Sequence, residues 1–356
     1  ELLFPNELKW DMTAAQDIQL EVDDSTADIP WEMLSARNPG SGRSQLALRA
    51  PLVRQLRVPD FRAIQRASKP TALVIGNPPA GRLGPPLQGA YDEAKSVQKV
   101  LEEREYEVEP KIYSPDARLD ESPASDIETT LLANDYRIIH IAAHGIFQPD
   151  DPTRSGVVIG PDEFLTAQLF RQVDVTPDLV FVNCCHLAAV AMGLETSAIE
   201  FTRQNLNRLG ASLARQLIDA GVRSVVVAGW AVDDTAADRF AHTFYEKMLD
   251  GDTFGRAVHA AREAAYDAAR NHSTWGAYQC YGDGGYRLPR DSRSGATDDE
   301  TFTKPITIAE TQRRIESLIN ALESSGSDAD QAWARDDLLN FEKAVEEREW
   351  VASDDG

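Results

Sequence analysis

The sequence predicts an α/β fold in which a doubly wound, mostly parallel sheet is flanked by helices and followed by a C-terminal helical extension. Three observations predict it. Short runs of β-branched and aromatic residues recur along the chain, which is typical of strands buried on both faces of a parallel sheet. Stretches with helical spacing separate these runs, so strand and helix alternate through the middle of the chain. No internal repeat is visible.

Residues 1–70 are expected to hold short strands and one short helix. Alternating apolar and polar side chains at 17–22 predict a strand with one exposed face. Pro30 suits the first position of a helix, and Asp28 is a suitable N-cap before it. A further strand and its exit are expected at 46–56.

The core is expected to begin with a strand at 71–75, which ends at a loop rich in glycine and proline. This loop lacks the glycine spacing of nucleotide-binding loops, so no nucleotide site is expected there. The helix expected at 90–104 turns Ala94, Val97, Val100 and Leu101 inward. A strand at 106–112, a helix at 127–134, a strand at 136–143, a polar loop at 147–153 and a hairpin of 156–160 with 163–165 follow.

The second half begins with the strand at 179–186, Leu-Val-Phe-Val-Asn-Cys-Cys-His. Residues 188–208 are poorly periodic, and the next helix, 211–220, is expected to end with Gly221 at its C′ position. A strand at 224–228, helices at 235–249 and 254–270 and a last strand at 275–281 complete the core. The helix at 254–270 is expected to present Val258, Ala261, Ala265 and Tyr266 on one face.

The domain organisation predicted from these elements is a single domain over residues 1–290, with its core at 71–290. A charged, turn-rich linker at 291–305 and an acidic helical tail at 306–356 follow. The first residues lack the basic region of a signal peptide and an initiator Met, so we expect a fragment of a longer protein.

Composition excludes several functions. The chain of 356 residues carries a formal net charge of −22, which argues against nucleic-acid binding, because counterion release requires clustered Lys and Arg. No apolar run is long enough to span a membrane. Only three cysteines occur, and two of them are neighbours, so a disulfide framework is not expected and a reducing, cytoplasmic location fits.

Two adjacent strand ends carry the candidate chemistry. The strand at 136–143 ends in His144, and the strand at 179–186 carries Cys184 and Cys185 at its end. Because ligands bind outside the carboxyl ends of strands in open α/β sheets, the histidine and a cysteine are a candidate base and nucleophile. The alternative for two adjacent cysteines is that they are buried small hydrophobic residues. A metal site formed by Cys184, Cys185, His186 and His144 is a less well supported hypothesis, since adjacent strand residues point to opposite faces.

The ordered motifs resemble those of the CHAT-domain peptidases, relatives of the caspases, separases and gingipains. The matching segments are 29–34 (Ile-Pro-Trp-Glu-Met-Leu), 89–94 (Gly-Ala-Tyr-Asp-Glu-Ala), 140–147 (His-Ile-Ala-Ala-His-Gly-Ile-Phe), 181–185 (Phe-Val-Asn-Cys-Cys), 228–234, Phe244 with Tyr245, and 275–283. The resemblance covers roughly residues 15–288, and it implies a caspase-like fold and a cysteine endopeptidase that needs no cofactor or metal.

The resemblance also implies residue roles. His144 aligns with the catalytic histidine and Cys185 with the nucleophile, while Gly145 and Cys185 would bind the oxyanion through their N–H groups. Cys184 aligns with the small residue before the nucleophile, and it remains an alternative nucleophile because strand residues alternate faces. His140, four residues before the catalytic histidine, is assigned to packing.

Substrate specificity is expected to depend on a few further residues. Asn183 stands where some relatives that cleave after basic residues carry an acidic group, so a basic P1 residue is not supported at that position. Trp230, Asp233 and Asp28 are further candidates, with core packing or helix capping as the alternatives.

The resemblance implies a protein substrate, which in some bacterial defence relatives is a gasdermin-like pore former. A sensor or recruitment region is expected to precede the fragment, and direct nucleic-acid or membrane binding is not expected. The alternative function is a catalytically silent scaffold or regulatory domain.

Overall fold

The computed structural model describes residues 17–289 apart from gaps at 24, 39–41, 57–65, 68, 117–121, 147–154, 167, 174 and 188–196. For residues 36–38, 42–44, 185–187 and 197–206 it describes the backbone alone. The described residues belong to one compact unit made of 1–58 and 62–290. The linker at 291–305, the acidic tail at 306–356 and the polar loop at 147–153 lie outside the described residues and stay predictions.

A ten-stranded, mostly parallel sheet forms the centre of the described part, in the order β1-β4-β12-β11-β10-β7-β5-β6. These strands are β1 (Ile18–Val22), β4 (Leu52–Leu56), β5 (Thr71–Gly76), β6 (Glu107–Ile112), β7 (Ile138–Ile146), β10 (Leu179–Leu187), β11 (Ser224–Ala228) and β12 (Tyr278–Tyr281). β12 runs antiparallel to β11, and the hairpin of β8 (Gly156–Gly160) and β9 (Glu163–Leu165) joins the end of β7. β2 (Ser35–Asn38) and β3 (Gly42–Gln45) form a separate small sheet.

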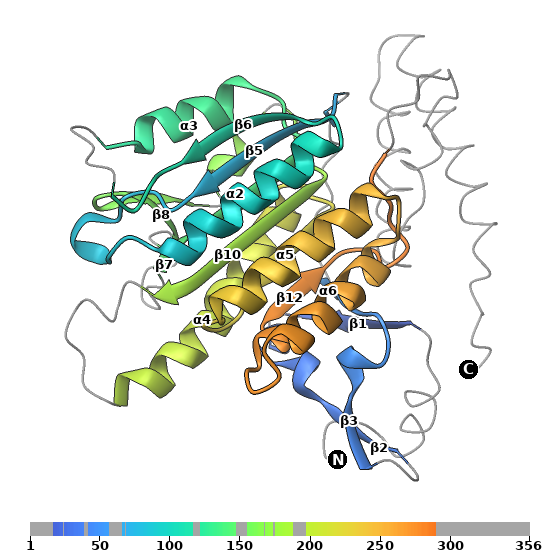
Figure 1. Ribbon diagram of the computed structural model, residues 1–356. Coiled ribbons are helices and arrows are strands. Elements are labelled where there is room, and N and C mark those ends of the chain that lie inside the picture. The colour runs from blue at the N-terminus through green and yellow to red at the C-terminus, as the bar shows by residue number, and fades with distance from the viewer. Residues whose placement is uncertain are drawn as a thin grey trace, which may run out of the picture. The chain divides into compact units, whose positions relative to one another are not determined.

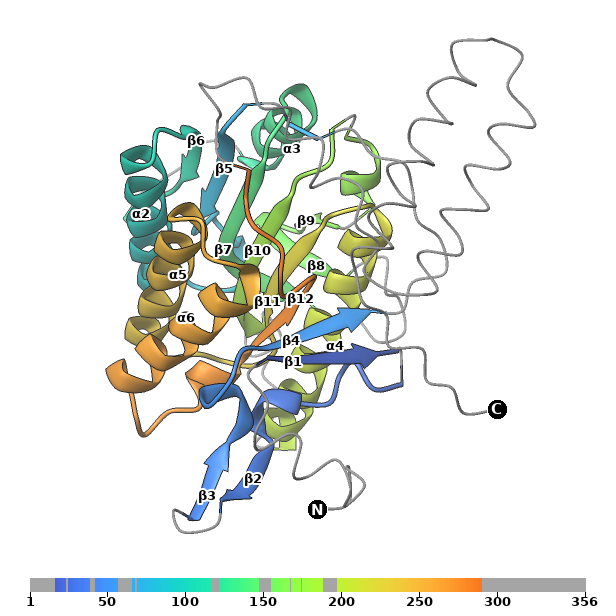
Figure 2. The same cartoon turned by 90° about the vertical axis from the view of Figure 1, so that its right-hand side faces the viewer.

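Helices cover both faces of the sheet (Figures 1 and 2). α2 (Gln88–Glu103), α5 (Asp234–Leu249) and α6 (Phe254–Ala268) pack on one face, and α3 (Ala124–Ala133) and α4 (Ser197–Asp219) pack on the other. The chain therefore winds in both directions from β5, first to β6 through α2 and then across to β7 through α3. This arrangement confirms the predicted doubly wound α/β fold with helices on both faces.

Alternation along the strands divides the core into two layers. In β10, Phe181 packs with α2, α5 and α6, whereas Val180 and Val182 pack with α3 and α4. The layer of Phe181 is rich in aromatic rings, and Phe240 stacks on Tyr278 with ring centroids 3.9 Å apart. The inward face predicted for α2 is confirmed, because Ala94, Val97, Val100 and Leu101 are all buried.

Several local predictions need correction. Residues 31–33 form a 3₁₀ turn without a side-chain cap, and Asp28 lies 3.5 Å from Arg208 instead of capping it. Residues 46–48 and 274–276 are also 3₁₀ turns, not parts of strands. α4 begins at Ser197 rather than at 211, since tertiary packing on β10 and β11 stabilises a helix of weak periodicity. Tyr266, expected on the inward face of its helix, is 36% exposed, and its ring lies edge-on to Trp275.

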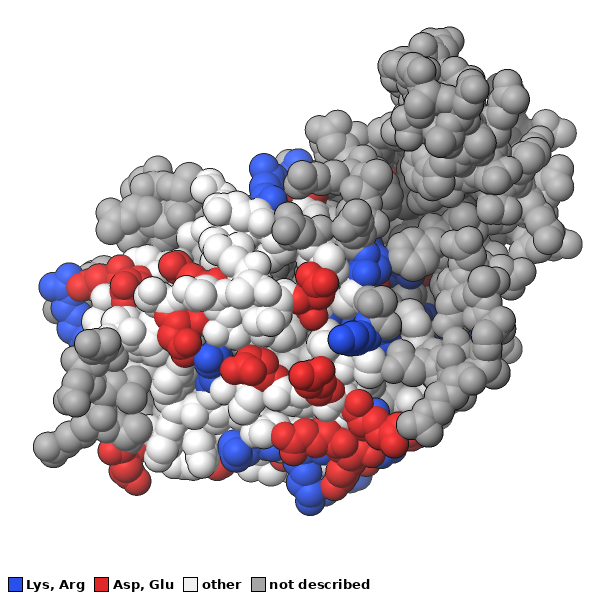
Figure 3. Space-filling model, turned by 90° about the horizontal axis from the view of Figure 1, so that it is seen from above, with Lys and Arg blue, Asp and Glu red and all other residues white. Residues whose placement is uncertain are grey.

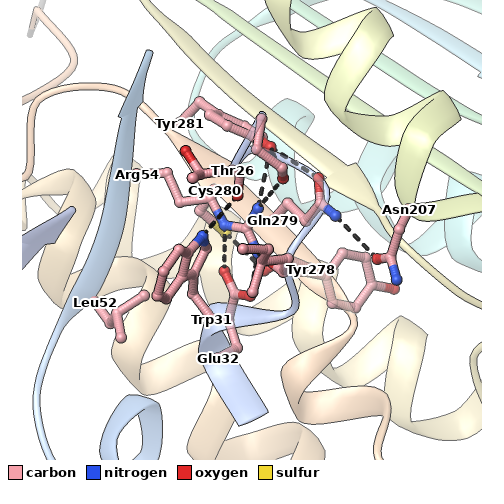
Figure 4. A network of polar contacts seen from close by, with 12 residues as sticks. Thr26, Trp31, Glu32, Leu52, Arg54, Asn207, Tyr278, Gln279, Cys280 and Tyr281 are labelled. Carbon is pink, nitrogen blue, oxygen red and sulfur yellow. Dashed lines mark hydrogen bonds and ion pairs between the residues drawn. The ribbon is translucent and has the colours of Figure 1, made fainter. Parts of the chain in front are cut away.

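A fully buried ionic cluster attaches the N-terminal part to the core (Figure 4). Glu32 accepts hydrogen bonds from Nε and Nη2 of Arg54 at 2.9 and 2.5 Å, and Nη2 of Arg262 lies 3.5 Å from its Oε1. Arg54 also donates to the hydroxyl of Tyr281, which donates to Gln279. Glu32 and Arg54 are therefore an integral part of the domain, joined to α6 and β12 through charged hydrogen bonds.

The described residues carry both acidic and basic side chains on the surface that Figure 3 shows. In the view of Figure 3, acidic side chains are interspersed with basic ones, and the described part of this face shows no continuous basic area. No helix in the described residues is long and apolar enough to cross a membrane.

Candidate active site

Three neighbouring parallel strands, β5, β7 and β10, bring their carboxyl ends to one edge of the sheet (Figure 1). β6 lies beside β5 on one side and β7 on the other, so the direction of winding reverses here. Ligand crevices of open α/β sheets form at such a reversal. The end of β7 carries His144 and the end of β10 carries the cysteine pair.

His144 is buried and held by the loop that follows β5. Its Nε2 lies 2.7 Å from the carbonyl oxygen of Pro85. A carbonyl can only accept a hydrogen bond, so we infer that Nε2 carries the proton and that Nδ1 carries the lone pair of the neutral ring. Gly84 permits the loop to come this close, because a Cβ there would lie 2.6 Å from Nε2 of His144.

β10 changes register next to this histidine. The strand pairs regularly with β7 up to Asn183 opposite Ala142, and pairing resumes with His186 opposite His144. Two residues of β10, Cys184 and Cys185, thus oppose one residue of β7, which is a β-bulge. The backbone of Cys185 therefore directly precedes the residue paired with His144. The side chain of Cys185 lies outside the described residues.

Cys184 belongs to the core on the opposite face. Its side chain is 3% exposed and packs in the same layer as Val180 and Val182, beneath α4. His144 lies on the other face, together with His140, since strand residues four apart share a face. The thiol of Cys184 and the imidazole of His144 are thus separated by the sheet, and the buried-hydrophobe interpretation describes Cys184.

Packing on the side of the sheet that α4 covers requires a glycine at position 145. A Cβ at this position would lie 2.9 Å from Cδ2 of Leu209 and 3.0 Å from Cβ of Cys184. The close packing of the core on this side of β7 is therefore a reason for a glycine at this position. The predicted role of its N–H group in binding an oxyanion is untouched by this contact and stays a prediction.

A cleft of about 210 Å³ opens beside the strand ends, between the first turns of α2 and α5. Its lining consists of Pro86, Leu87, Gln88, Gly89, Ala90, Glu93, Asn183, Asp234 and Ala237. Asn183 Nδ2 donates to Glu93 Oε2 over 2.6 Å, and both side chains are buried. Of the four residues expected to determine specificity, Asn183 lies in this cleft.

The other three candidates have structural roles. Asp233 is the N-cap of α5, where its carboxylate accepts a hydrogen bond from the N–H of Ala236. Asp28 pairs with Arg208. Trp230 packs beside Gly276, at which a Cβ would lie 3.7 Å from the indole. None of these three residues lines the cleft.

Sequence reasoning missed Glu93 and Asp234 as site residues, although both lie in motifs that it recognised. A glutamate one position before the inward-facing Ala94 was the available signal, because a charged residue on the buried side of a helix is rarely placed there without a partner. His140 was predicted to pack, and its ring lies 5.0 Å from that of Phe181, but it also has a polar partner, since Nδ1 lies 3.2 Å from the hydroxyl of Tyr245. Burial and the negative charge of Glu93 hold the pKa of Tyr245 well above its usual value, so this hydroxyl stays protonated.

No group of three or more His, Cys, Asp or Glu residues in the described ranges is arranged to hold a metal ion.

The doubly wound sheet, with His144 at the end of β7 and the two cysteines at the end of the neighbouring strand β10, defines this part of the chain as a caspase-like α/β domain. The model of the CHAT domain family matches residues 1–283 of the chain. The chain belongs to the CHAT domain family.

Solved structures with a similar fold include a cysteine proteinase and a separase. The Arg-specific cysteine proteinase gingipain R is 13% identical, with 80% of this chain and 69% of that chain covered at a TM-score of 0.46. A complex of the pro- and mature domains of Porphyromonas gingivalis RgpB is 10% identical, with 80% and 70% covered at 0.47. Separase in the Saccharomyces cerevisiae separase–securin complex is 12% identical over 75% of this chain but only 16% of that chain, at 0.40. These identities describe a likeness of fold. No curated protein sequence matches significantly.

Proposed function

We propose that this chain is a cysteine endopeptidase in which Cys185 is the nucleophile and His144 the general base and acid. The observation that carries the proposal is the register of β7 and β10, which sets the backbone of Cys185 beside the residue paired with His144. A nucleophile and a base on adjacent strand ends, next to a cleft, suit acyl transfer.

The orientation of His144 supports its role. With Nε2 donating to Pro85, Nδ1 is the atom that accepts the thiol proton of Cys185. The thiolate attacks the scissile carbonyl, and the protonated imidazole then donates its proton to the leaving amine. Water, deprotonated by the same ring, hydrolyses the acyl-enzyme. The N–H groups of Gly145 and Cys185 would stabilise the oxyanion.

The burial of Cys184 supports Cys185 as the nucleophile over its neighbour. Cys280, the remaining cysteine, is fully buried, and burial raises the pKa of its thiol to about 12. A thiol with that pKa is protonated at neutral pH and a poor nucleophile. The alternative function, a silent scaffold, predicts no reactive thiol at all.

The proposal includes a protein substrate, since the reaction cleaves a peptide bond. A cytoplasmic role in bacterial defence, a gasdermin-like pore former as the substrate and a preceding sensor region remain proposals implied by the family resemblance.

The proposal is tested by digesting a proteome-derived peptide library with the whole chain and identifying cleavage sites by mass spectrometry. We expect Cys185→Ala and His144→Ala each to lower cleavage by roughly 10³-fold or more. Cys184→Ala is the matched control, and it should keep most of the activity.

A thiol-reactive probe provides a second readout. It should label the peptide that contains Cys185 in the folded chain, and His144→Ala should slow labelling at neutral pH. Equal cleavage by the Cys185→Ala chain contradicts the proposal. Absence of both cleavage and labelling favours the scaffold function.

A further inference from the structure

A buried polar network joins four elements next to the strand ends. Its members are Glu93 of α2, His140 of β7, Asn183 of β10 and Tyr245 of α5, each at most 3% exposed. Asn183 Nδ2 donates to Oε2 of Glu93 over 2.6 Å. Oε1 of the same carboxylate lies 3.4 Å from Nε2 of His140, whose Nδ1 lies 3.2 Å from the hydroxyl of Tyr245. Breaking such a network costs free energy, because it leaves buried polar groups without partners.

The carboxylate of Glu93 suits both of its neighbours, because a carboxylate accepts hydrogen bonds and donates none. Asn183 presents an N–H group to one oxygen. A lone pair on Nε2 of His140 would be repelled by the other oxygen, so the neutral ring carries its proton on Nε2, and the hydroxyl of Tyr245 donates to Nδ1. Each oxygen of Glu93 therefore faces an N–H group from a different strand.

α2 keeps Glu93 in a fixed position. The helix buries Ala90, Ala94 and Val97 on the same face, and it packs against β5, β7 and α5. A side chain anchored on such a helix moves little, since the core around it is close-packed. Glu93 can therefore hold the strands that it contacts.

Asn183 is the last residue of β10 in regular pairing with β7. It lies opposite Ala142, and the bulge formed by Cys184 and Cys185 follows directly. The extra residue of a bulge has no partner in the ladder, so the ladder by itself fixes a bulge less firmly than a regular strand. The hydrogen bond from Asn183 to Glu93 holds β10 at the point where its regular pairing stops.

His140 provides Glu93 with a contact on the histidine strand. It lies four residues before His144 on β7, and strand residues four apart share a face. One carboxylate thus contacts β7 before the candidate base and β10 before the candidate nucleophile. The placement of the two strand ends relative to each other depends on both contacts.

We propose that Glu93 is a positioning residue of the active site, which holds β10 at the start of the bulge and so sets the place of Cys185 relative to His144. This role rests on the proposed peptidase function. Glu93 acts through Asn183 and His140, and it takes no part in proton transfer or in binding the substrate.

The test is the rate at which iodoacetamide alkylates Cys185 in the whole chain, followed by mass spectrometry at a series of pH values. A thiol whose proton passes to His144 reacts quickly at neutral pH. Glu93→Leu is similar in size and has no acceptor, and it should slow alkylation by about 10-fold near neutral pH, because a displaced thiol keeps its ordinary pKa of about 8.5. Above about pH 9 the rates should converge, since the thiol then ionises without the imidazole.

Glu93→Gln is the conservative variant. When the amide of Asn183 turns over, its Oδ1 accepts from the introduced amide, whose own oxygen still faces His140. Alkylation near neutral pH should therefore stay close to the wild-type rate and well above that of Glu93→Leu. Glu102→Leu, at an exposed position of the same helix, is the matched control and should react like the wild type.

Cys280 reports the folding of each variant. It is fully buried, so iodoacetamide should modify it only in unfolded chains. Asn183→Ala breaks the same hydrogen bond from the side of the strand, and it decides the question if Glu93→Leu exposes Cys280. It should slow the alkylation of Cys185 as Glu93→Leu does.

His144→Ala separates the positioning role from the proposed peptidase function. Slow alkylation in His144→Ala, together with wild-type rates in Glu93→Leu and Asn183→Ala, overturns the positioning role and leaves the dyad standing. An equal loss in Glu93→Gln and Glu93→Leu also overturns it, since the hydrogen bond is then not what matters. Wild-type alkylation in His144→Ala contradicts the dyad and the positioning role together.

Discussion

Gly145 lies next to the last residue of β7, and a Cβ there would meet Leu209 of α4 and Cys184 of β10. Both neighbours belong to the buried layer beneath α4, so neither can move far. The residue next to the proposed catalytic histidine is thus held in place by the core layer beneath α4. Packing here controls the position of the backbone that would meet the substrate.

Gly145→Ala is expected to lower the free energy of unfolding by about 1–3 kcal/mol, because overpacking a core has that cost. Cleavage should fall more than stability alone explains, since the strand end must shift. Urea denaturation and library cleavage measure the two effects.

Gly285→Ala is the control for this substitution. A Cβ there would meet only Asp283 Oδ1, at an ordinary 3.4 Å, so stability should change by less than about 0.5 kcal/mol. Equal stability of both alanine variants would contradict the role given to Gly145.

At the scale of the element, burial in β12 shifts the pKa values of Cys280 and Tyr281. Burial raises the pKa of Cys280 to about 12 and that of Tyr281 to about 12, in each case partly offset by a nearby arginine. In the unfolded chain these groups lose their protons near their reference values of 9.0 and 10.0. Folding therefore favours the protonated form of both groups. The stability that this contributes to the folded chain is lost as pH rises.

The free energy of unfolding is expected to fall between pH 9 and pH 12, by on the order of 1 kcal/mol per pH unit for each group within its window. Cys280→Ala should make this fall less steep, because only the unfolded wild-type chain releases the thiol proton there. Urea denaturation at a series of alkaline pH values measures the slope.

Val226→Ala controls for the lost volume. Val226 pairs with Cys280 in the register of β11 and β12, and it does not titrate. Its truncation should lower stability by a similar amount at every pH. An unchanged slope in Cys280→Ala would show that this thiol does not contribute to the alkaline transition.

At the scale of the whole molecule, the cluster of Glu32, Arg54 and Arg262 joins segments that are far apart in sequence. Figure 4 shows the pair of Glu32 and Arg54. Arg54 also donates to the carbonyl oxygens of Ala27 and Ile29, and Arg262 donates to those of Leu52 and Tyr278. The N-terminal segment is thereby attached to β12 and α6. Its loss would expose one edge of the sheet and part of the aromatic core.

Glu32→Ala should lower the free energy of unfolding by about 3–5 kcal/mol, because it leaves two buried guanidinium groups without their carboxylate. Chemical denaturation followed by far-UV circular dichroism measures the change. Arg82→Ala is the control, since its pair with Asp162 is largely exposed and should contribute about 0–1 kcal/mol. A similar loss in both variants would contradict the importance of the buried cluster.

Much of the fold could be predicted from the sequence, because the signals are local. Strands buried on both faces, such as 71–76 and 224–228, appear as uninterrupted apolar runs, and α2 appears as a helical stripe. The carboxyl ends of β7 and β10 follow from the same runs, so His144 and Cys185 could be singled out by their positions along the chain. The helix at 197–219 could not, since its stability comes from packing on β10 and β11.

The sequence by itself determined the order of strands and helices and the residues at the strand ends, since hydrophobic periodicity acts over neighbouring residues. The tertiary structure alone decided that Cys184 packs in the layer beneath α4 and that a β-bulge follows it in β10, which interrupts the alternation that sequence reasoning assumes. It also decided the lining of the cleft. Glu93 and Asn183 lie 90 residues apart and meet only when α2 packs on the sheet, so no local pattern brings them together.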